Sequence, residues 1–381
     1  MKLELIAPTA FGLEAVTARE LKTLGYEQTE TENGRVLFWG DEYDVARTNL
    51  QLRTAARVLI RLASFPAVTF EELFQGVMAI PWEDWLPEDA AFPVDGRSVK
   101  SGLFSVSDCQ AIVKKAIVER LKRNYRREIF EETGPLYRIE VSLLKDVATI
   151  TLDTSGAGLH KRGYRKMTGE APLKETMAAA LLLLTYWKRD RLLLDPMCGT
   201  GTIPIEAALI ARNQAPGLGR SFAAERWPNF SPDIWEKARQ EAKDLLCPSG
   251  DFRIYGSDID AKAVDFARAC AKAAGVSGCV RLEQSDFRKL TSRESYGFLV
   301  TNPPYGERLG QENEVISLYR EMGRVFRQLP DWSYYILSAH PEFEKYFGRK
   351  ADRRRKLYNG RLVCQYYQYL GAKPPRKAVS I

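Results

Sequence analysis

The stretch Leu192–Ala208, LLLDPMCGTGTIPIEAA, decides the fold of the second half of the chain. It reads as a short buried strand, an aspartate at the strand end, a glycine-rich turn and the start of a helix. Gly199 and Gly201 would let the backbone approach a ligand closely and expose amide donors. The stretch lacks both the Gly-Lys-Ser/Thr of a triphosphate loop and the G-x-G-x-x-G of a dinucleotide loop. Asp195 would repel a pyrophosphate and suits a cationic or zwitterionic ligand, although an ordinary tight turn would also explain this stretch alone.

The rest of the second half alternates strands with helices. Strand-like runs such as FRIYGSD, VRLEQSD, GFLVTNPP and SYYILSA are separated by helical runs such as DAKAVDFARACAKAAG and VISLYREMGRVFRQL. This alternation predicts an α/β domain with a parallel sheet and helices on both of its faces. The chain closes with RRKLYNGRLVCQYYQYL, in which Asn359-Gly360 between apolar runs predicts an antiparallel hairpin on the sheet edge.

Acidic residues end two further strands. Asp258 ends FRIYGSD and could accept both hydroxyls of a ribose. It lies 63 positions after Asp195, so a long insertion is expected between them, and Ala215–Trp235 fits that role. Asp286 ends VRLEQSD and could accept from an adenine amino group, with Phe287 packing on the ring. Each acid alone could be a solvated strand end or a helix cap, but acids at three successive strand ends beside a glycine turn favour a ligand site.

A fourth strand end carries the sequence NPPYGERL, Asn302–Leu309. Two prolines cannot continue a strand, because proline lacks the backbone donor. The Asn302 side-chain oxygen and the Pro303 carbonyl could each accept one N–H of a nucleobase amine, which would aim its lone pair at an electrophile. Proline rigidity would fix that carbonyl, and Tyr305 could stack on a flipped base. The alternative interpretation is a proline-rich strand terminator.

The amino-acid composition limits the classes of protein to which the chain can belong. The 381 residues are 45% hydrophobic and 28% charged, which is typical of a soluble globular protein with two or three domains. The net charge of +7 permits an anionic partner without requiring one. Six cysteines without C-x-x-C spacing and only two histidines predict neither a metal site nor a disulfide framework. No signal-peptide pattern is visible, and the longest apolar run, Met177–Trp187, is too short to span a membrane, so a cytoplasmic protein without membrane contact is expected.

The first half has α+β character. The run Ser107–Tyr125 predicts a helix with Ser107 as its cap, and Tyr137–Gly156 predicts a hairpin. A basic, glycine-containing joint at Gly158–Pro172 marks the boundary between this half and the half in which strands and helices alternate.

The combined motifs of Lys166–Leu370 resemble the class I S-adenosylmethionine-dependent methyltransferases, and Asn-Pro-Pro-Tyr resembles the signature of the branch that methylates exocyclic amino groups. The resemblance implies a Rossmann-like domain with a mainly parallel seven-stranded sheet and an antiparallel edge hairpin. It implies S-adenosylmethionine as cofactor, with Asp195, Gly199 and Gly201 around the methionine part. Cys198 is expected to contact it through its backbone alone. The cofactor contacts that it implies are Asp195, Pro196, Cys198, Gly199, Thr200, Gly201, Asp258, Ile259, Asp286, Phe287 and Asn302, and the implied catalytic set is Asn302, Pro303, Pro304 and Tyr305.

The first half resembles a THUMP domain over Arg97–Leu121, preceded by a small ferredoxin-like domain. With the joint GLHKRGYR and the following APLKETMAAALL, nearly the whole chain is similar to the bacterial THUMP-containing 23S rRNA guanine-N2 methyltransferases. The resemblance implies a ferredoxin-like domain at residues 1–55, a THUMP RNA-binding domain at 56–158 and a methyltransferase domain at 159–381. Some family members carry a second methyltransferase domain; this sequence ends at Ile381, so a single activity is expected.

The distribution of basic residues supports RNA as the partner. They interleave with aromatic residues in the predicted helix and in the joint, as in phosphate-tracking surfaces, although a charge run can equally be a solvated helix face. The predicted RNA contacts are Lys100, Lys114, Lys115, Lys122, Arg123, Lys161, Arg162, Tyr164 and Arg165.

Three alternatives to a monomeric 23S rRNA guanine-N2 methyltransferase remain open at this point. A tRNA guanine-N2 methyltransferase would share every motif, because neither THUMP nor Asn-Pro-Pro-Tyr reads the type of RNA. A DNA adenine methyltransferase would share Asn-Pro-Pro-Tyr and leave the first half unexplained. An RNA-binding assembly factor with an inactive methyltransferase fold would have no need of the glycine turn and the strand-end acids.

Overall fold

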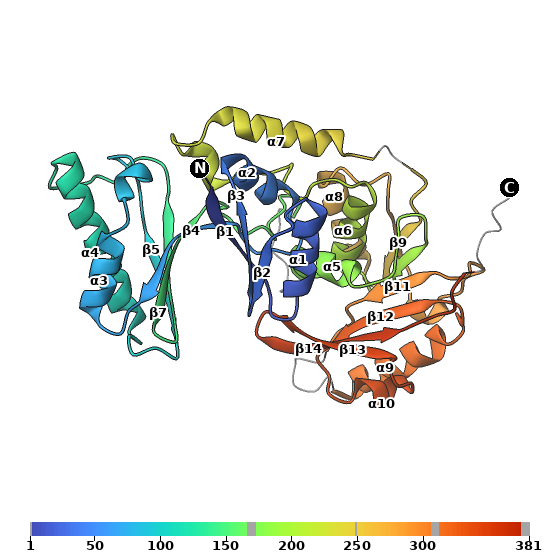
Figure 1. Cartoon of the computed structure of the whole chain (residues 1–381). Coiled ribbons are helices and arrows are strands. Elements are labelled where there is room, and N and C mark those ends of the chain that lie inside the picture. The colour runs from blue at the N-terminus through green and yellow to red at the C-terminus, as the bar shows by residue number, and fades with distance from the viewer. Residues whose placement is uncertain (1, 166–172, 248–249, 306–311, 375–381) are drawn as a thin grey trace. The chain divides into compact units, whose positions relative to one another are not determined.

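The computed structural model describes residues 2–165, 173–247, 250–305 and 312–374. The chain divides into two compact units, each containing one seven-stranded sheet (Figure 1). Unit 1 comprises Met1–Thr9, Thr17–Leu159 and Arg220–Ala242; unit 2 comprises Ala10–Val16, His160–Gly219 and Lys243–Ile381. Each unit therefore contains a segment from the other half of the sequence.

The sheet of unit 1 has the strand order β2-β3-β1-β4-β7-β6-β5. Its strands are β1 (Leu3–Pro8), β2 (Thr29–Glu32), β3 (Arg35–Gly40), β4 (Leu59–Pro66), β5 (Val94–Val99), β6 (Arg138–Leu144) and β7 (Val147–Asp153). The helices of the first half are α1 (Glu14–Thr23), α2 (Glu42–Gln51), α3 (Phe70–Met78), the 3-10 turn η1 (Trp82–Asp84) and α4 (Val106–Tyr125).

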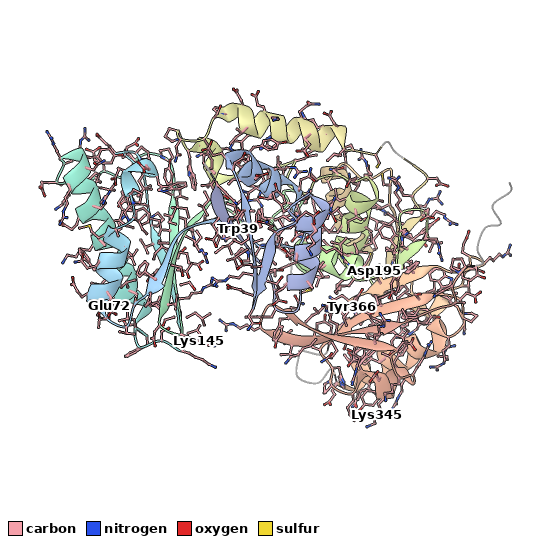
Figure 2. The ribbon with its side chains drawn as sticks, viewed as in Figure 1. Trp39, Glu72, Lys145, Asp195, Lys345 and Tyr366 are labelled. Carbon is pink, nitrogen blue, oxygen red and sulfur yellow. The ribbon has the colours of Figure 1, made fainter. Side chains whose placement is uncertain are left out.

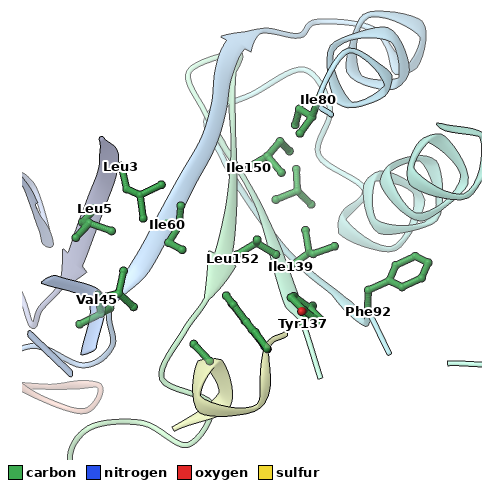
Figure 3. Packing of buried hydrophobic residues seen from close by; sticks show 14 of the residues in the cluster. Leu3, Leu5, Val45, Ile60, Ile80, Phe92, Tyr137, Ile139, Ile150 and Leu152 are labelled. Atoms are coloured by element: carbon green, nitrogen blue, oxygen red, sulfur yellow. The ribbon is translucent and has the colours of Figure 1, made fainter. Parts of the chain in front are cut away.

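One continuous sheet serves both expected N-terminal domains, because β4 pairs with β1 on one side and with β7 on the other. Leu5 lies opposite Ile60, and Ile60 lies opposite Leu152. Figure 3 shows these side chains within one hydrophobic cluster that also contains Val45 and Ile139. The boundary at residues 55 and 56 remains a proposal, and the core is continuous across it.

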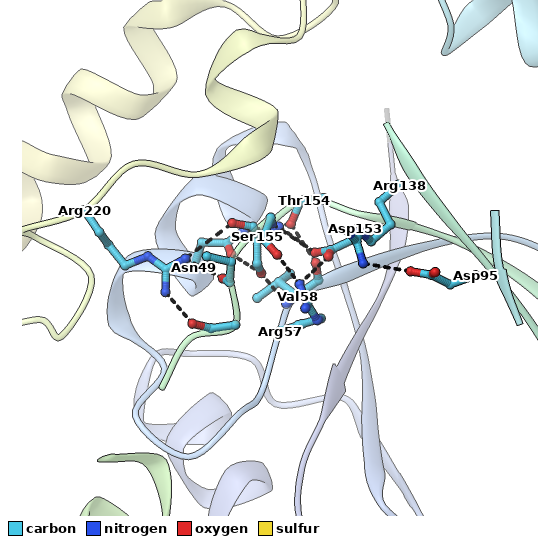
Figure 4. Close-up of polar contacts among 12 residues, drawn as sticks. Asn49, Arg57, Val58, Asp95, Arg138, Asp153, Thr154, Ser155 and Arg220 are labelled. Atoms are coloured by element: carbon cyan, nitrogen blue, oxygen red, sulfur yellow. Dashed lines mark hydrogen bonds and ion pairs between the residues drawn. The ribbon is translucent and has the colours of Figure 1, made fainter. Parts of the chain in front are cut away.

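A polar network joins α2 to the end of β7 (Figure 4). Asn49 Nδ2 donates to Thr154 Oγ1 at 2.8 Å, and Ser155 Oγ donates to Asn49 Oδ1 at 2.6 Å. The Val58 amide donates to Ser155 Oγ at 2.8 Å, and Arg57 pairs with Asp153. Buried polar groups need such partners, so the network fixes how β4 enters the sheet.

The start of α4 differs from the prediction. Ser105, not Ser107, is the N-cap residue, and its side chain makes no capping hydrogen bond. The helix begins at Val106 because the backbone of Ser105 is already extended there, with φ −74° and ψ 101°. The predicted hairpin is confirmed, since β6 and β7 pair antiparallel from Arg138–Asp153 to Leu144–Val147.

The sheet of unit 2 has the strand order β10-β9-β8-β11-β12-β14-β13. Its strands are β8 (Leu193–Asp195), β9 (Ile254–Asp258), β10 (Arg281–Gln284), β11 (Phe298–Thr301), β12 (Ser333–Ser338), β13 (Arg353–Asn359) and β14 (Leu362–Tyr369). The helices of the second half are α5 (Glu175–Leu183), α6 (Thr202–Ala211), α7 (Pro232–Asp244), α8 (Ala261–Ala273), α9 (Glu312–Phe326) and α10 (Phe343–Phe347), with 3-10 turns η2 (Ala223–Arg226) and η3 (Phe287–Lys289).

The expected class I architecture is confirmed in this sheet. Strands β8 to β12 pair in parallel, and β14 pairs antiparallel with both β12 and β13. The Asn359-Gly360 turn closes the hairpin, with Asn359 opposite Leu362 and Gly360 at a φ of +65°. The reversed strand is β14, so β13 forms the edge and runs parallel to β12.

The expected insertion between α6 and β9 contributes to the core of unit 1. Trp227 stacks on Tyr137 with ring centroids 4.4 Å apart and an interplanar angle of 15°. Its indole Nε1 donates to the Leu136 carbonyl at 3.0 Å, and Phe222 stacks on Trp235 at 5.4 Å. Arg220 donates to the Gly158 carbonyl at 2.7 Å. Unit 1 is therefore incomplete without Arg220–Ala242.

Trp227→Ala should lower the free energy of unfolding of unit 1 by about 3–5 kcal/mol, because it removes a fully buried indole, its stack and its hydrogen bond. Urea unfolding followed by circular dichroism measures the change. Phe104→Ala is the matched control, since Phe104 is 82% exposed in the same unit, and its effect should stay within about 0.5 kcal/mol. Equal stability of the two variants would contradict the structural role of the insertion.

Candidate active site

Four polar strand ends meet at one edge of the unit 2 sheet. β8, β9, β10 and β11 are neighbouring parallel strands, with Asp195 opposite Gly256 and Gln284 opposite Asp258. Carboxyl ends of parallel strands share one edge, where ligands of open α/β sheets bind. The structure therefore brings together the strand ends that carry Asp195, Asp258, Asp286 and Asn302, and Figure 2 labels Asp195.

Asp195 is a buried carboxylate, 2% exposed. Its Oδ1 accepts from Thr301 Oγ1 at 2.7 Å and from the Met197 amide at 3.2 Å. Burial raises the pKa of Asp195 to about 7, and the nearby charge of Asp258 adds to that rise. Among the described residues no cationic side chain pairs with Asp195, so a positively charged ligand group would favour its ionised form.

The glycine turn after β8 depends on two left-handed residues. Gly199 has a φ of +50° and Gly201 a φ of +76°. A Cβ on Gly201 would lie 2.8 Å from the Cβ of Ala267, whereas a Cβ on Gly199 would meet no atom within 4 Å. Gly201 is thus required by packing as well as by conformation, and Gly199 leaves open space for a ligand.

Asp258 holds the turn, a role that sequence reasoning missed. Its Oδ2 accepts from the Gly199 amide at 2.8 Å, and its Oδ1 accepts from the Asp260 amide at 3.0 Å. Each carboxylate oxygen retains acceptor capacity for a ribose hydroxyl. The next residue, Ile259, is 61% exposed and offers an apolar surface beside this carboxylate.

Asp286 and Phe287 lie at the end of β10 in different surroundings. Asp286 caps η3 by accepting from the Arg288 amide at 3.0 Å. Phe287 is 6% exposed and contacts Phe326 edge-on, with centroids 6.5 Å apart. The ring of Phe287 belongs to the hydrophobic core, so little of its surface is open to an adenine.

The tetrapeptide after β11 is anchored on both sides. Thr301, the last residue of the strand, binds Asp195, and the Tyr319 hydroxyl donates to the Pro304 carbonyl at 2.9 Å. Pro303 is buried and Pro304 is exposed. The Tyr305 hydroxyl donates to Asn302 Oδ1, so this acceptor is partly used within the tetrapeptide. Gly306–Leu309 of the quoted stretch lie outside the described residues.

The turn carries Cys198 with its thiol directed inward. Its amide donates to the Ser257 carbonyl at 2.9 Å, and burial raises the pKa of the thiol. Pro196 is buried and Thr200 is half-buried. Contact of these three residues with the cofactor, for Cys198 through its backbone, stays a prediction.

Arg162 and Tyr164 require a correction, because both are 5% exposed and cannot present their side chains to RNA. Arg162 Nε lies 3.5 Å from Glu206 Oε1, and the Tyr164 hydroxyl donates to the same oxygen at 3.2 Å. Glu206, the acid of the mostly apolar helix α6, could have signalled this, since a buried carboxylate needs partners. Arg165 is also turned inward, whereas Lys161 is exposed.

Two lysines of the predicted basic face of α4 also form ion pairs within the protein. Lys114 Nζ donates to the Phe92 carbonyl at 3.0 Å and pairs with Glu132 at 2.5 Å, so its charge serves the fold. Lys122 pairs with Glu128 at 2.9 Å. Lys115, Arg123 and Lys100 remain exposed.

No described helix is long and apolar enough to cross a membrane. Within the described ranges, no group of three or more histidine, cysteine, aspartate or glutamate side chains is placed to hold a metal ion.

Three family models match successive parts of the chain. They are the RlmL ferredoxin-like domain at residues 4–59, the THUMP domain at 67–153 and the RMKL-like methyltransferase domain at 162–368. YpsC of Bacillus subtilis (strain 168), which carries the name of an RNA methyltransferase, is 49% identical over 379 residues, covering 99% of this chain and 98% of its own. The chain belongs to the RMKL-like methyltransferase family.

Three further similar proteins have names or descriptions that mention a substrate or a cofactor product. Ribosomal RNA large subunit methyltransferase K/L of Psychromonas ingrahamii is 35% identical over 100% of this chain, which spans 51% of that longer protein. SMU.472, described as a methyltransferase complexed with SAH, is 45% identical with a TM-score of 0.93, covering 98% of this chain and 99% of its own. A Listeria monocytogenes protein described as an N6-adenine-specific DNA methylase is 51% identical with a TM-score of 0.93, covering 98% and 97%.

This methyltransferase uses S-adenosylmethionine, and the residues at the sheet edge fit that cofactor. The buried carboxylate of Asp195 suits a cationic ligand, and S-adenosylmethionine carries an ammonium and a sulfonium. The open space at Gly199 accommodates close approach, and exposed Ile259 beside Asp258 suits a nucleoside. When bound, the cofactor supplies an electrophilic methyl group.

Asp195→Asn should stabilise the ligand-free protein more at pH 8 than at pH 5. Burial raises the pKa of Asp195 from 3.8 to about 7, so the folded protein keeps a proton that the unfolded chain releases within this window. The wild-type free energy of unfolding therefore falls as the pH rises from about 4 to 7, by an amount on the order of 4 kcal/mol. The Asp195→Asn variant lacks this contribution, because asparagine does not titrate. Urea unfolding of both proteins at several pH values measures the difference, and a difference independent of pH would contradict the assignment.

Proposed function

We propose that this protein is a cytoplasmic enzyme that transfers a methyl group from S-adenosylmethionine to the exocyclic N2 of a guanosine in 23S rRNA. The hydrogen bond of 2.7 Å between Thr301 and Asp195 carries the proposal, because it ties the strand end before Asn302 to the strand end before the glycine turn. An amine held at Asn302 would then face a methyl donor held at the turn.

The chemistry follows from the delocalised lone pair of a nucleobase amine. Asn302 Oδ1 and the Pro303 carbonyl would each accept one N–H, which localises the lone pair along the line of attack. The same two dipoles would stabilise the positive charge that develops on nitrogen. The proton can leave after methyl transfer, so most of the acceleration would come from positioning rather than from a general base.

Tyr305 has two roles in this proposal. Its hydroxyl occupies one lone pair of Asn302 Oδ1 and thereby orients the amide, while the second lone pair stays available for the amine. Its ring offers a stacking surface for a base taken out of its helix.

One end of the unit 1 sheet supports an RNA partner. Lys145, labelled in Figure 2, is exposed in the β6–β7 turn, and its amide donates to the Val99 carbonyl at 3.2 Å. Lys100 and Phe104 are exposed in the loop that follows Val99, and Phe104 is 82% exposed. Lysines beside an open aromatic ring suit unpaired nucleotides, whose phosphates and bases they would contact.

The comparisons favour RNA over DNA as the substrate. The RlmL ferredoxin-like and THUMP matches cover the first half, and the K/L relative is named for large-subunit ribosomal RNA. The description of the Listeria protein supports the competing DNA adenine reaction, which would leave that half without a role. A tRNA guanine-N2 methyltransferase is the alternative within the RNA class, and an inactive assembly factor is the alternative outside the enzymes.

Mass spectrometry of rRNA, tRNA and DNA nucleosides from a deletion strain tests the proposal. We expect N2-methylguanosine to be lost from one position of 23S rRNA and restored by the wild-type gene. Loss from tRNA would favour the tRNA alternative, and loss of N6-methyladenine from DNA would favour the DNA reaction. An unchanged set of nucleosides together with no cofactor binding would support the inactive factor.

Asn302→Ala should retain cofactor binding but lower single-turnover methylation by about 100-fold or more, because it removes a preorganised acceptor used by the amine. Calorimetry with S-adenosylhomocysteine measures the affinity. Asn229→Ala is a control amide on the surface of unit 1, and it should methylate at the wild-type rate. Wild-type turnover by Asn302→Ala would reject the role of Asn302.

Phe104→Ala should weaken binding of an unmodified 23S rRNA transcript by about 10-fold, the effect of removing one stacking platform. Cofactor affinity should stay unchanged. Ile129→Ala, which removes another exposed apolar side chain beyond the opposite end of α4, is the matched control. Equal transcript affinities of the two variants in a filter-binding titration would argue against an RNA contact at Phe104.

A further inference from the structure

Arg165, the last described residue of the basic joint, is bound within unit 2 rather than exposed. Its Nη2 donates to Thr202 Oγ1 at 2.6 Å, and its Nη1 pairs with Glu175 Oε1 at 3.0 Å. The side chains of Arg165 and Glu175 are 14% and 5% exposed. The guanidinium thus links the first residue of α5 to the first residue of α6.

Thr202 is the point at which the glycine turn becomes a helix. It directly follows Gly201, the N-cap of α6, and it is 4% exposed. The other end of the turn is held by Asp258, which accepts from the Gly199 amide at 2.8 Å. A carboxylate therefore anchors the strand side of the turn, and a guanidinium anchors the helix side.

The charge of Arg165 is poorly placed for stability alone. A helix N-terminus disfavours a nearby cation, and a buried ion pair often stabilises a fold no more than apolar residues would. Burial raises the pKa of Glu175, and the charge of Arg165 opposes that rise. What the arrangement provides is a fixed direction for the Thr202 hydroxyl, since guanidinium hydrogen bonds have a rigid planar geometry.

We propose that Arg165 is a positioning residue for S-adenosylmethionine: through Thr202 and Glu175 it fixes the helix side of the Gly199–Gly201 turn in the conformation that receives the cofactor. This role rests on the proposed use of the turn as the cofactor site and is independent of which nucleobase is methylated. It replaces the earlier expectation that Arg165 contacts RNA.

A double-mutant cycle between Arg165 and Thr202 tests the proposal. Arg165→Lys keeps the charge and loses the planar fork, and Thr202→Val keeps the shape and loses the hydroxyl. Each should raise the dissociation constant of S-adenosylhomocysteine by about 10-fold in calorimetry, the effect of one charge-assisted hydrogen bond. The double variant should also lose only about 10-fold, because both changes remove the same interaction.

Further measurements distinguish a positioning role of Arg165 from a general loss of protein structure. Thr202→Ser retains the hydroxyl and should recover affinity to within about 2-fold of wild type. Arg253→Lys, at a surface ion pair of the same unit, should leave cofactor affinity unchanged. In Arg165→Lys the KM for S-adenosylmethionine should rise with its dissociation constant, while kcat at saturating cofactor should change by no more than about 3-fold.

Three results would overturn the proposal. One is an unchanged cofactor affinity in folded Arg165→Lys, and another is a loss of about 100-fold in the double variant, which would mean independent roles. The third is weaker binding of an unmodified 23S rRNA transcript with normal cofactor affinity, which would make Arg165 an RNA contact. If Arg165→Lys fails to fold, Thr202→Val against Thr202→Ser decides the matter. Failure of the guanine-N2 assignment would appear in the nucleoside analysis and leave these affinities interpretable.

Discussion

The hydrogen bond between Thr301 and Asp195 is the interaction on which the candidate site depends. It joins the carboxyl ends of β8 and β11, the two central strands of the parallel sheet of unit 2. Because proline cannot extend β11 beyond Asn302, the chain leaves the sheet at this point, one residue after the threonine that binds the buried carboxylate. During transfer the amine nitrogen has to lie in line with the bond between the sulfur and the methyl carbon. The contact between Thr301 and Asp195 helps to set the separation of the elements proposed to hold the two reactants.

In unit 2, side chains hold the Gly199–Gly201 turn at both of its ends. Glycines supply the left-handed conformations at Gly199 and Gly201, but glycine is also the residue with the most freedom to adopt others. Asp258 and Arg165, from β9 and from the joint, restrict that freedom through hydrogen bonds to Gly199 and Thr202. The turn therefore combines a backbone that only glycine readily adopts with side chains that hold it in place.

The parts of the structure that were predictable from sequence are those with local signals. The strand, acid, turn and helix of Leu192–Ala208 and the Asn359-Gly360 hairpin are short-range patterns, and both were confirmed. Side-chain direction in the joint was not predictable in the same way, since Arg162 and Tyr164 look like surface residues until Glu206 is seen to be buried against them. The contact of Asp258 with the Gly199 amide and the merging of the N-terminal domains into one sheet arise from pairings distant in sequence, for which a single sequence has no signal.

The exchange of segments between the units has a consequence for synthesis of the chain. Unit 1 lacks Trp227 and its neighbours until residue 242 has been translated, and unit 2 takes Ala10–Val16 from the first half of the sequence. Domains usually fold in order as they emerge from the ribosome. Here unit 1 can complete its fold only after Arg220–Ala242, a segment of the second half, has been synthesised. A single cut between Leu159 and His160 would therefore leave each unit without one of its segments.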